Sequence, residues 1–168
     1  RRLYPESGWM PWVDRAVTKN RAFNETTIPA DIHFPDVSSA KTIKDVTDLY
    51  KGKVIFMDIW ATWCGPCRQA MKSMQPMKEE LKGKEVDFVF VTDETSPQVL
   101  WKKMIADIHG EHYYLTNSQI ADVLKKYQFT GIPAYLILDR KGRVVYQHQG
   151  FPGTEVMKQE LEKALGTF

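Results

Sequence analysis

The chain has 168 residues, a length that fits one compact domain with a short extension and that can bury a core without disulfide staples. Its 23 basic and 21 acidic residues leave a net charge of +2, which excludes charge-driven nucleic-acid binding as the default function. No apolar run approaches the about 18 residues of a membrane span, and 2 cysteines cannot build a disulfide-rich scaffold or a four-thiolate zinc site.

The first segment, residues 1–27, shows no clear hydrophobic period and is broken by proline and glycine. Its Trp9 and Trp12 are too apolar for a free linker, so we expect them to pack on this domain or on an upstream one, with a ligand or partner site as the alternative. Because the chain starts at Arg1 without an apolar signal segment, we expect a mature or trimmed fragment. The predicted division is an extension or linker at 1–27 and a domain at 28–168.

From residue 28 onward, strands and helices alternate in the predicted structure. Residues 53–60 (KVIFMDIW) form an almost continuous apolar run, which is typical of a buried central strand. The other strands are expected at 30–34, 85–92, 112–115, 134–138 and 144–148, and the last two form a hairpin. Helices are expected at 67–81, from Ser96 to about Ile108, at 118–127 and at 153–165.

Three details of the helices are predicted with them. Ser96 is expected to cap the second helix with Pro97 in its first position, and Asn117 or Ser118 to cap the third. Pro76 should kink the first helix, whose methionine stripe is most simply core. The element order predicts an α/β sandwich with parallel strands followed by an antiparallel pair.

The strongest chemical signal is Cys64-Gly65-Pro66-Cys67, which follows the buried strand and opens a helix. Cysteines three residues apart at a helix start can bridge within one turn, and the helix N-terminus stabilises the thiolate of the first. The second thiol lies one turn further in and can attack a mixed disulfide. Thiol–disulfide exchange needs this asymmetry between an exposed attacker and a nearby resolving thiol.

The cysteine pair could also be half of a zinc site or an inert structural disulfide, and both are less favoured. A zinc site would need further ligands, and His33, His109, His112 and His148 do not lie at ligand spacing from the cysteines. A structural disulfide stays open as the second alternative. We therefore expect no metal and no cofactor.

Residues 58–67 (DIWATWCGPC) resemble the active-site stretch of thioredoxin, and residues 28–168 resemble the TlpA/ResA-like branch of thioredoxin-fold thiol–disulfide oxidoreductases. Gly131-Ile132-Pro133 before a strand looks like the cis-proline loop of that fold, the hairpin at 138–144 also matches, and residues 92–116 resemble the insertion of this branch. Residues 1–27 are not covered. The resemblance implies a thioredoxin-like three-layer sandwich with a central mixed β-sheet flanked by helices.

By this resemblance, Cys64 is the nucleophile and Cys67 the resolving thiol. Pro133 in cis would leave the backbone of Ile132 open to pair with a substrate segment, as an added strand does. Trp63 is expected to line the substrate site, whereas Trp60 is expected in the core.

Two positions depart from the branch. Ala70 stands where many members carry Glu, and Asp58 where the buried strand often carries Asn. Asp58 has the placement of thioredoxin's buried acid, so we expect it to be buried, to have a raised pKa and to exchange a proton with Cys67. The Gly-Pro pair inside the motif is that of thioredoxin, a reductant with a potential of about −270 mV, which favours a reductase over an oxidase.

The predicted function is therefore an enzyme that cycles Cys64 and Cys67 between dithiol and disulfide and reduces disulfides in protein substrates. The resemblance implies a location outside the cytoplasm, in the periplasm or cell envelope, and an upstream thiol electron donor, for which a membrane-bound protein is a candidate. The alternative is a redox-inactive binding module in which the disulfide is structural. A peroxidase of the peroxiredoxin type ranks low, because it would need a lone peroxidatic cysteine in a Thr-containing loop.

Overall fold

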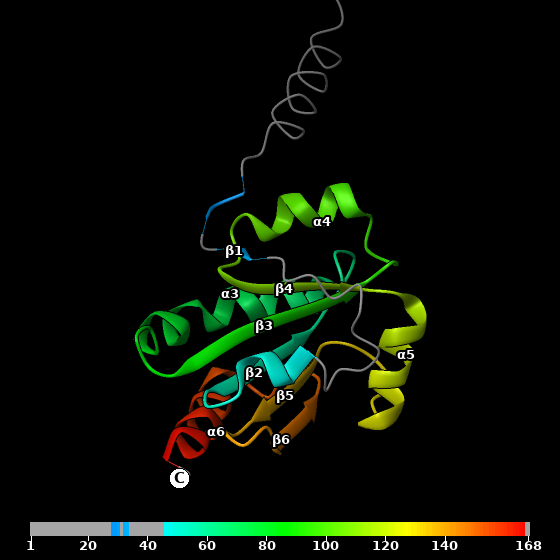
Figure 1. Ribbon diagram of the computed structural model, residues 1–168. Helices are drawn as coiled ribbons and strands as arrows, with labels where there is room; N and C mark the ends of the chain where they lie inside the picture. Colours follow the sequence, from blue (N-terminus) through cyan, green and yellow to red (C-terminus); the bar gives the residue numbers. More distant parts are fainter. Residues whose placement is uncertain (1–27, 31, 34–45, 167–168) are drawn as a thin grey trace, which may run out of the picture.

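The computed structural model describes residues 28–30, 32–33 and 46–166, so the extension predicted at 1–27 lies outside the described residues. Figure 1 shows strands and helices alternating along the chain. The strands are β1 Ile32–His33, β2 Val54–Ile59, β3 Val86–Asp93, β4 Gly110–Leu115, β5 Ala134–Leu138 and β6 Val144–Gln149. The helices are η1 Asp48–Tyr50, α3 Gly65–Glu80, α4 Gln98–Ile105, α5 Asn117–Lys126 and α6 Thr154–Gly166.

The strands form one six-stranded mixed sheet in the order β1-β4-β3-β2-β5-β6. The pairs β1–β4, β4–β3 and β3–β2 are parallel, whereas β2–β5 and β5–β6 are antiparallel. This arrangement confirms the predicted α/β sandwich, with the crossover connections of the parallel half carried by helices. All six residues of β2 are buried because it has a paired strand on each side and helices on both faces.

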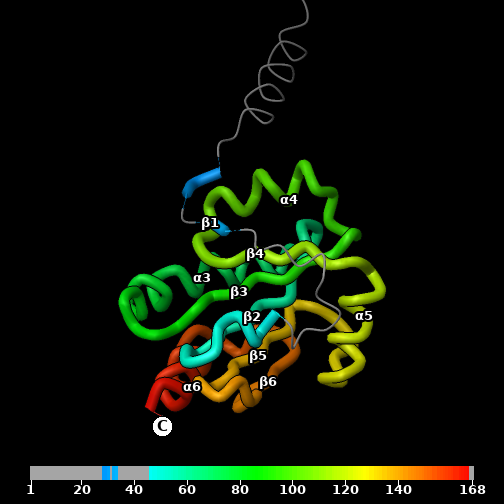
Figure 2. Tube along the Cα trace, viewed as in Figure 1, coloured from blue at the N-terminus to red at the C-terminus, as the bar shows by residue number. Residues whose placement is uncertain are grey.

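The helices make the other two layers, and in Figure 2 α5 lies to the right of the strands while α3 and α6 lie toward the left. Helices α3 and α6 pack against the face of the sheet that carries Phe56 and Ile137. Helix α4 joins that layer through Trp101 and Ile105, whereas α5 packs through Ile120 and Val123 on the opposite face. The central strand thus ends between two helical layers, directly before the cysteine motif.

The N-cap residues predicted for two helices are wrong. Pro97, not Ser96, stands at the cap position of α4. No side chain of the described residues caps that end, because the Ser96 hydroxyl is engaged elsewhere in the fold. At α5 the cap is Thr116, whose side chain accepts from the backbone N–H of Gln119 while the Gln119 side chain accepts from the Thr116 N–H. This reciprocal capping box outcompetes a cap at Asn117 or Ser118.

The first long helix begins at Gly65, two residues before the predicted start, and continues through Pro76. Helix α4 ends at Ile105 and is followed by a turn, short of the predicted end near Ile108. The methionine stripe of α3 is core, as predicted, with Met74 and Met77 each 2% exposed.

Gly110 marks the point where the chain leaves the α4 turn and enters β4. Its backbone φ angle is +140°, a value that residues other than glycine rarely adopt. A Cβ atom here would lie 2.6 Å from the Phe88 carbonyl oxygen and 2.9 Å from the Phe90 ring. Glycine therefore lets β4 approach β3 closely at this step.

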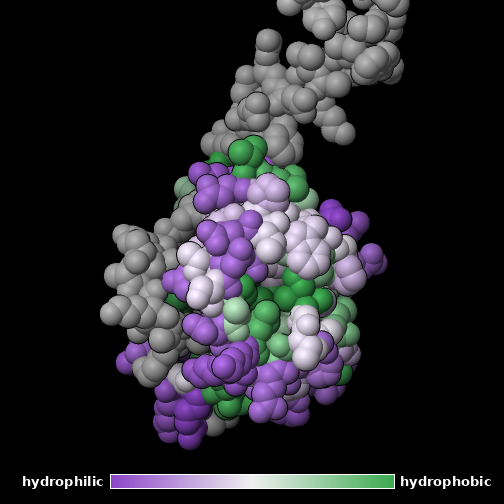
Figure 3. Space-filling view, turned by 90° about the vertical axis from the view of Figure 1, so that its right-hand side faces the viewer, coloured by the Kyte–Doolittle hydropathy of each residue, from purple (hydrophilic) through white to green (hydrophobic). Residues whose placement is uncertain are grey.

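The surface seen from the right-hand side of Figure 1 carries hydrophobic residues in its middle, bordered by hydrophilic ones (Figure 3). Within the described part of the chain, no helix combines the length and the apolar character needed to cross a membrane.

Candidate active site

The two cysteines lie where the central strand passes into α3, and they form a disulfide with a Cα–Cα distance of 5.3 Å. Cys64 is the N-cap residue of α3, and its Sγ accepts a hydrogen bond from the backbone N–H of Cys67 at 3.2 Å. Pro66 sits in the first turn, where its missing N–H costs no hydrogen bond. The helix N-terminus therefore points its partial positive charge at the sulfur of Cys64.

The two sulfurs differ in burial in the predicted sense, but by less than the sequence suggests. Cys64 is 4% exposed and Cys67 0%. Both belong to a buried cluster with Trp60, Met71 and residues of α4, which covers Cys64 more than a bare helix cap would. Trp60 is 2% exposed, which confirms its predicted place in the core.

The loop before β5 lies against this cluster. The Ile132–Pro133 bond is cis, as predicted, and Ile132 packs against the cluster that contains both cysteines. The Pro133 carbonyl accepts from Gly150 N–H at 2.8 Å, and the Gln149 side chain accepts from Thr130 N–H at 2.7 Å. The end of β6 thus holds this loop beside the disulfide.

Trp63 stands at the surface next to Cys64 and is 62% exposed. Its indole Nε1 donates to the Thr95 hydroxyl at 3.0 Å, and Thr95 in turn bonds to the Asp93 carboxylate. A large apolar ring is therefore fixed at the surface beside the reactive pair, where a partner could contact it.

Ser96 is a supporting residue that the sequence reasoning assigned to another role. Its hydroxyl accepts from the Thr62 N–H at 3.0 Å, lies 2.8 Å from the Thr92 hydroxyl and is fully buried. Its carbonyl accepts from the Tyr114 hydroxyl at 2.6 Å. The loop after β3 thereby supports the backbone two residues before Cys64. A Ser-Pro pair is a strong helix-start signal, and nothing local in the sequence distinguishes the two uses.

Asp58 is buried in β2, as predicted, with 0% exposure. It lies on the same face of the strand as Phe56 and Trp60, which is the face that α3 covers. Neither carboxylate oxygen has a hydrogen-bond partner among the described residues. Burial raises the pKa of this carboxyl well above its ordinary range, and the positive charge of Lys78 opposes that rise.

Lys78 is the site residue that the sequence analysis missed. Its ammonium donates to the His109 carbonyl at 2.7 Å and lies 4.6 Å from the centre of the Phe90 ring. Burial lowers its pKa to about 8, against the attraction of Asp58. A signal was present: Lys78 continues the stripe of Cys67, Met71 and Met74 along α3, and a cation on a buried stripe predicts a buried negative partner.

These groups fit two-electron sulfur chemistry. They supply a disulfide at a helix N-terminus and a buried acid on the strand beneath the helix. Among the described residues, no group of three or more His, Cys, Asp or Glu side chains could hold a metal ion.

Comparisons with known proteins point in the same direction. Residues 23–165 match the Redoxin family. The chain is 26% identical over 115 residues to the thiol-disulfide oxidoreductase ResA of Bacillus thuringiensis subsp. konkukian, a match that covers 68% of this chain and 65% of that protein. It is 32% identical over 115 residues to the thioredoxin-like protein YneN of Bacillus subtilis, covering 67% and 65%. The matches thus span just under two thirds of these relatives' length.

The fold has solved counterparts as well. A crystal structure of a thiol:disulfide interchange protein from Chlorobium tepidum aligns with a TM-score of 0.63 at 23% identity, over 71% of this chain and 85% of that one. At this identity the likeness concerns the fold alone, and it confirms the predicted thioredoxin-like sandwich.

Proposed function

Because the chain belongs to the Redoxin family, we propose that it is a thiol–disulfide oxidoreductase that reduces disulfides in protein substrates through Cys64 and Cys67. The observation that carries this proposal is the Cys64–Cys67 bridge at the N-terminus of α3, directly after the central strand. The relative ResA is named a thiol-disulfide oxidoreductase. A redox-inactive binding module has no comparable support.

In the proposed cycle, the Cys64 thiolate attacks one sulfur of the substrate disulfide and expels the other as a thiolate, which leaves a mixed disulfide. The Cys67 thiolate then attacks Sγ of Cys64 and releases the second substrate thiolate. The substrate gains two electrons and two protons, and the enzyme is left with the Cys64–Cys67 disulfide that the structure holds. An upstream dithiol donor returns the electrons by the same exchange.

We assign to Asp58 the role of the base that removes the proton of the Cys67 thiol. An ordinary Asp carboxylate is too weak a base to deprotonate a thiol, because their pKa values differ by about 4 to 5 units. The pKa of Asp58 is raised, which narrows this gap and makes its carboxylate a better-matched base for the resolving thiol.

We assign the substrate to the surface at Trp63 and Ile132, with the buried Pro133 holding the loop in its cis conformation. Trp63 offers an exposed ring, and the loop at Ile132 packs against the cysteine cluster. A substrate segment bound along this loop would place its disulfide at Cys64. We further propose that the reaction takes place outside the cytoplasm, in the periplasm or cell envelope, where protein disulfides persist and the resemblance places its branch.

The test is trapping with Cys67→Ser. We expect this variant to accumulate mixed disulfides between Cys64 and a model disulfide protein, because nothing resolves them. Cys64→Ser is the matched control and should accumulate none. In the reduced wild type, Cys64 should alkylate before Cys67, and the pair should open under mild reductant. A bridge that stays oxidised under those conditions would establish the structural alternative instead.

A further inference from the structure

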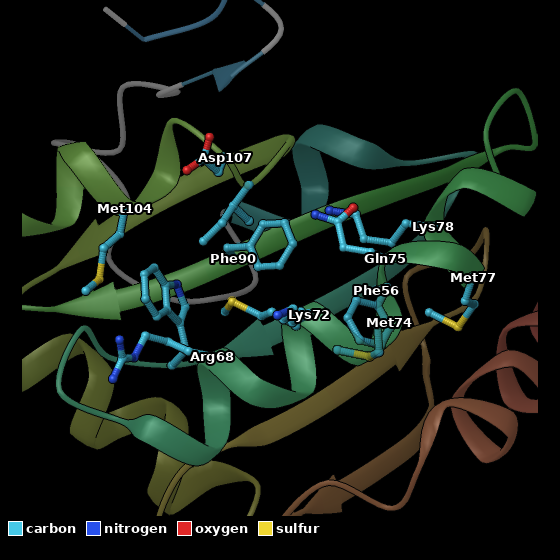
Figure 4. A pocket seen from close by; sticks show the side chains of 13 residues that line it. Phe56, Arg68, Lys72, Met74, Gln75, Met77, Lys78, Phe90, Met104 and Asp107 are labelled. Carbon is cyan, nitrogen blue, oxygen red and sulfur yellow. The ribbon is translucent and has the colours of Figure 1, made fainter. Parts of the chain in front are cut away.

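A groove of about 310 Å³ runs between α3 and α4 beside the cysteine motif. Figure 4 shows Met104 and Asp107 on one wall, Phe90 at the floor, and Arg68 and Lys72 along the other wall. The α3 residues that line it extend from position 68 to 78, which corresponds to about 15 Å of helix. A groove of this size lies at the small end of ligand sites and fits one or two apolar side chains.

The floor and one wall of the groove are apolar. Trp60, Met71 and Phe90 belong to the buried cluster of the cysteines, and Met104 packs against that cluster from α4. Methionine side chains are unbranched and polarizable, so they adapt to apolar groups of different shape. The indole Nε1 of Trp60 is a buried donor without a partner in the described part of the chain.

The exposed rim is mainly cationic. Arg68 and Lys72 lie one turn apart on α3, and neither has an ion pair or a side-chain hydrogen bond within the described residues. Lys78, further along, is committed to the His109 carbonyl. Across residues 46–166, Asp107 is the acid that lines the groove. An apolar ligand that carries a negative charge therefore complements this rim better than a neutral or basic one.

The groove begins one helical turn from the reactive pair. The Arg68 N–H donates to the Cys64 carbonyl at 3.3 Å, and Trp60 and Met71 share the cluster of Cys64 and Cys67. An extended segment advances about 3.3 Å per residue, so four or five residues would span the groove. A protein segment that presents a disulfide to Cys64 is thus within reach of this groove.

We propose that the α3–α4 groove is a substrate subsite that takes an apolar side chain and a neighbouring carboxylate from the segment beside the reducible disulfide. This subsite rests on the proposed reductase function. It gives the enzyme a preference for acidic, apolar sequences around the disulfide it reduces, which the cysteine motif itself does not supply.

The test compares two synthetic disulfide peptides that differ only in the residues flanking an apolar side chain, Glu in one and Lys in the other. Wild type should reduce the Glu peptide with a kcat/KM about three- to tenfold higher, as expected for two exposed charge pairs. Lys72→Glu and Arg68→Glu should each reduce this preference, and the double variant should reverse it. Lys102→Glu on α4 is the matched control, an exposed charge change that does not line the groove.

Each outcome has one meaning. If wild type reduces neither peptide nor any disulfide protein, the proposed function fails. If it reduces both peptides equally, or if the preference survives in the double variant, the function stands and the subsite is overturned. Competition by decanoate without any discrimination between the peptides would also overturn it, in favour of a free amphipathic anion. A preference for Leu over Ala in the Glu peptide that Met104→Glu abolishes would support the apolar half.

Discussion

The two faces of the sheet differ in how they handle buried polar groups. The core under α5 is built around apolar side chains such as Leu136, and its buried Tyr113 has its hydroxyl 2.6 Å from that of Tyr50. Asp87 on this face keeps one carboxylate oxygen 3.0 Å from the Lys53 ammonium, and its other oxygen has no hydrogen-bond partner among the described residues. On the face covered by α3, α4 and α6, Asp58, Trp60 and Tyr135 each bury a polar atom with no hydrogen-bond partner among the described residues.

This difference separates the part of the core that stabilises the fold from the part that serves the site. A buried polar group without a partner costs about 1–3 kcal/mol, and a charged one costs more. On the α3 face these costs fall at Asp58 and at the strand residue opposite it, Tyr135. The cost under α5 is smaller, because Asp87 keeps its ion pair with Lys53, whereas both carboxylate oxygens of Asp58 lack a hydrogen-bond partner among the described residues.

The largest expected effect on stability is on the α5 face. Leu136→Ala should lower the free energy of unfolding by about 2–5 kcal/mol, because Leu136 is 1% exposed and its truncation opens a cavity in the core. The rate of disulfide reduction per folded molecule should stay at the wild-type value. Chemical denaturation beside a turnover assay measures both. Leu49→Ala, at a residue 62% exposed, is the control and should shift stability by less than about 0.5 kcal/mol.

On the other face, Asp58→Asn should raise the free energy of unfolding instead of lowering it. The folded acid holds its proton to a higher pH than the unfolded chain does, so wild-type stability falls as pH rises from about 4 toward the raised pKa. The variant has no carboxyl here and does not lose stability in this way. The difference in free energy of unfolding between variant and wild type should be absent near pH 4 and should grow with pH, by about 1.4 kcal/mol for each unit by which the pKa of Asp58 is raised.

The same variant should slow the resolution step near neutral pH and recover part of the rate at higher pH, where the Cys67 thiolate forms unaided. Turnover from pH 6 to 9 measures this. Tyr135→Phe, which removes the neighbouring unpartnered hydroxyl, should leave the shape of the wild-type profile unchanged. Superimposable profiles for Asp58→Asn and wild type would show that this carboxyl has no acid–base role.

The smallest effect is expected from Ser96→Ala. It leaves the Thr62 N–H without its acceptor, which should cost about 1–3 kcal/mol, at the lower end if the Thr92 hydroxyl can turn to replace it. Because Thr62 precedes Cys64 by two residues, the reduction potential of the disulfide should shift as well. Ser73→Ala, which removes an exposed hydroxyl bonded to its own helix, is the matched control. An unchanged potential would limit Ser96 to a purely structural role.

The sequence predicted what is encoded locally. The apolar run of β2, the cysteines at a helix start and the Ile132–Pro133 loop each carry their signal within a few residues, and the structure confirms all three elements. The burial of Asp58 could be predicted as well, because Met57 and Ile59 flank it in a continuous apolar strand.

The parts that escaped prediction depend on partners distant in sequence. Ser96 carries the local signal of a helix cap, yet its hydroxyl bonds to Thr62, 34 residues away. Lys78 approaches Asp58 only because α3 packs over β2. The groove exists only where the α4 segment folds back alongside α3, and no local pattern specifies that distance.

Gly110 has a consequence for how this protein can vary. A substitution there would push on the Phe88 backbone and on the Phe90 ring, which forms the floor of the groove. A Cβ at Gly83 or Gly142 would meet no atom of the described residues within 4 Å. In a saturation mutagenesis screen, position 110 should therefore tolerate almost no replacement, and the two turn positions should tolerate asparagine. The residues on the α3 rim of the groove could then vary in sequence, while Gly110 in β4 keeps the Phe90 ring on its floor in place.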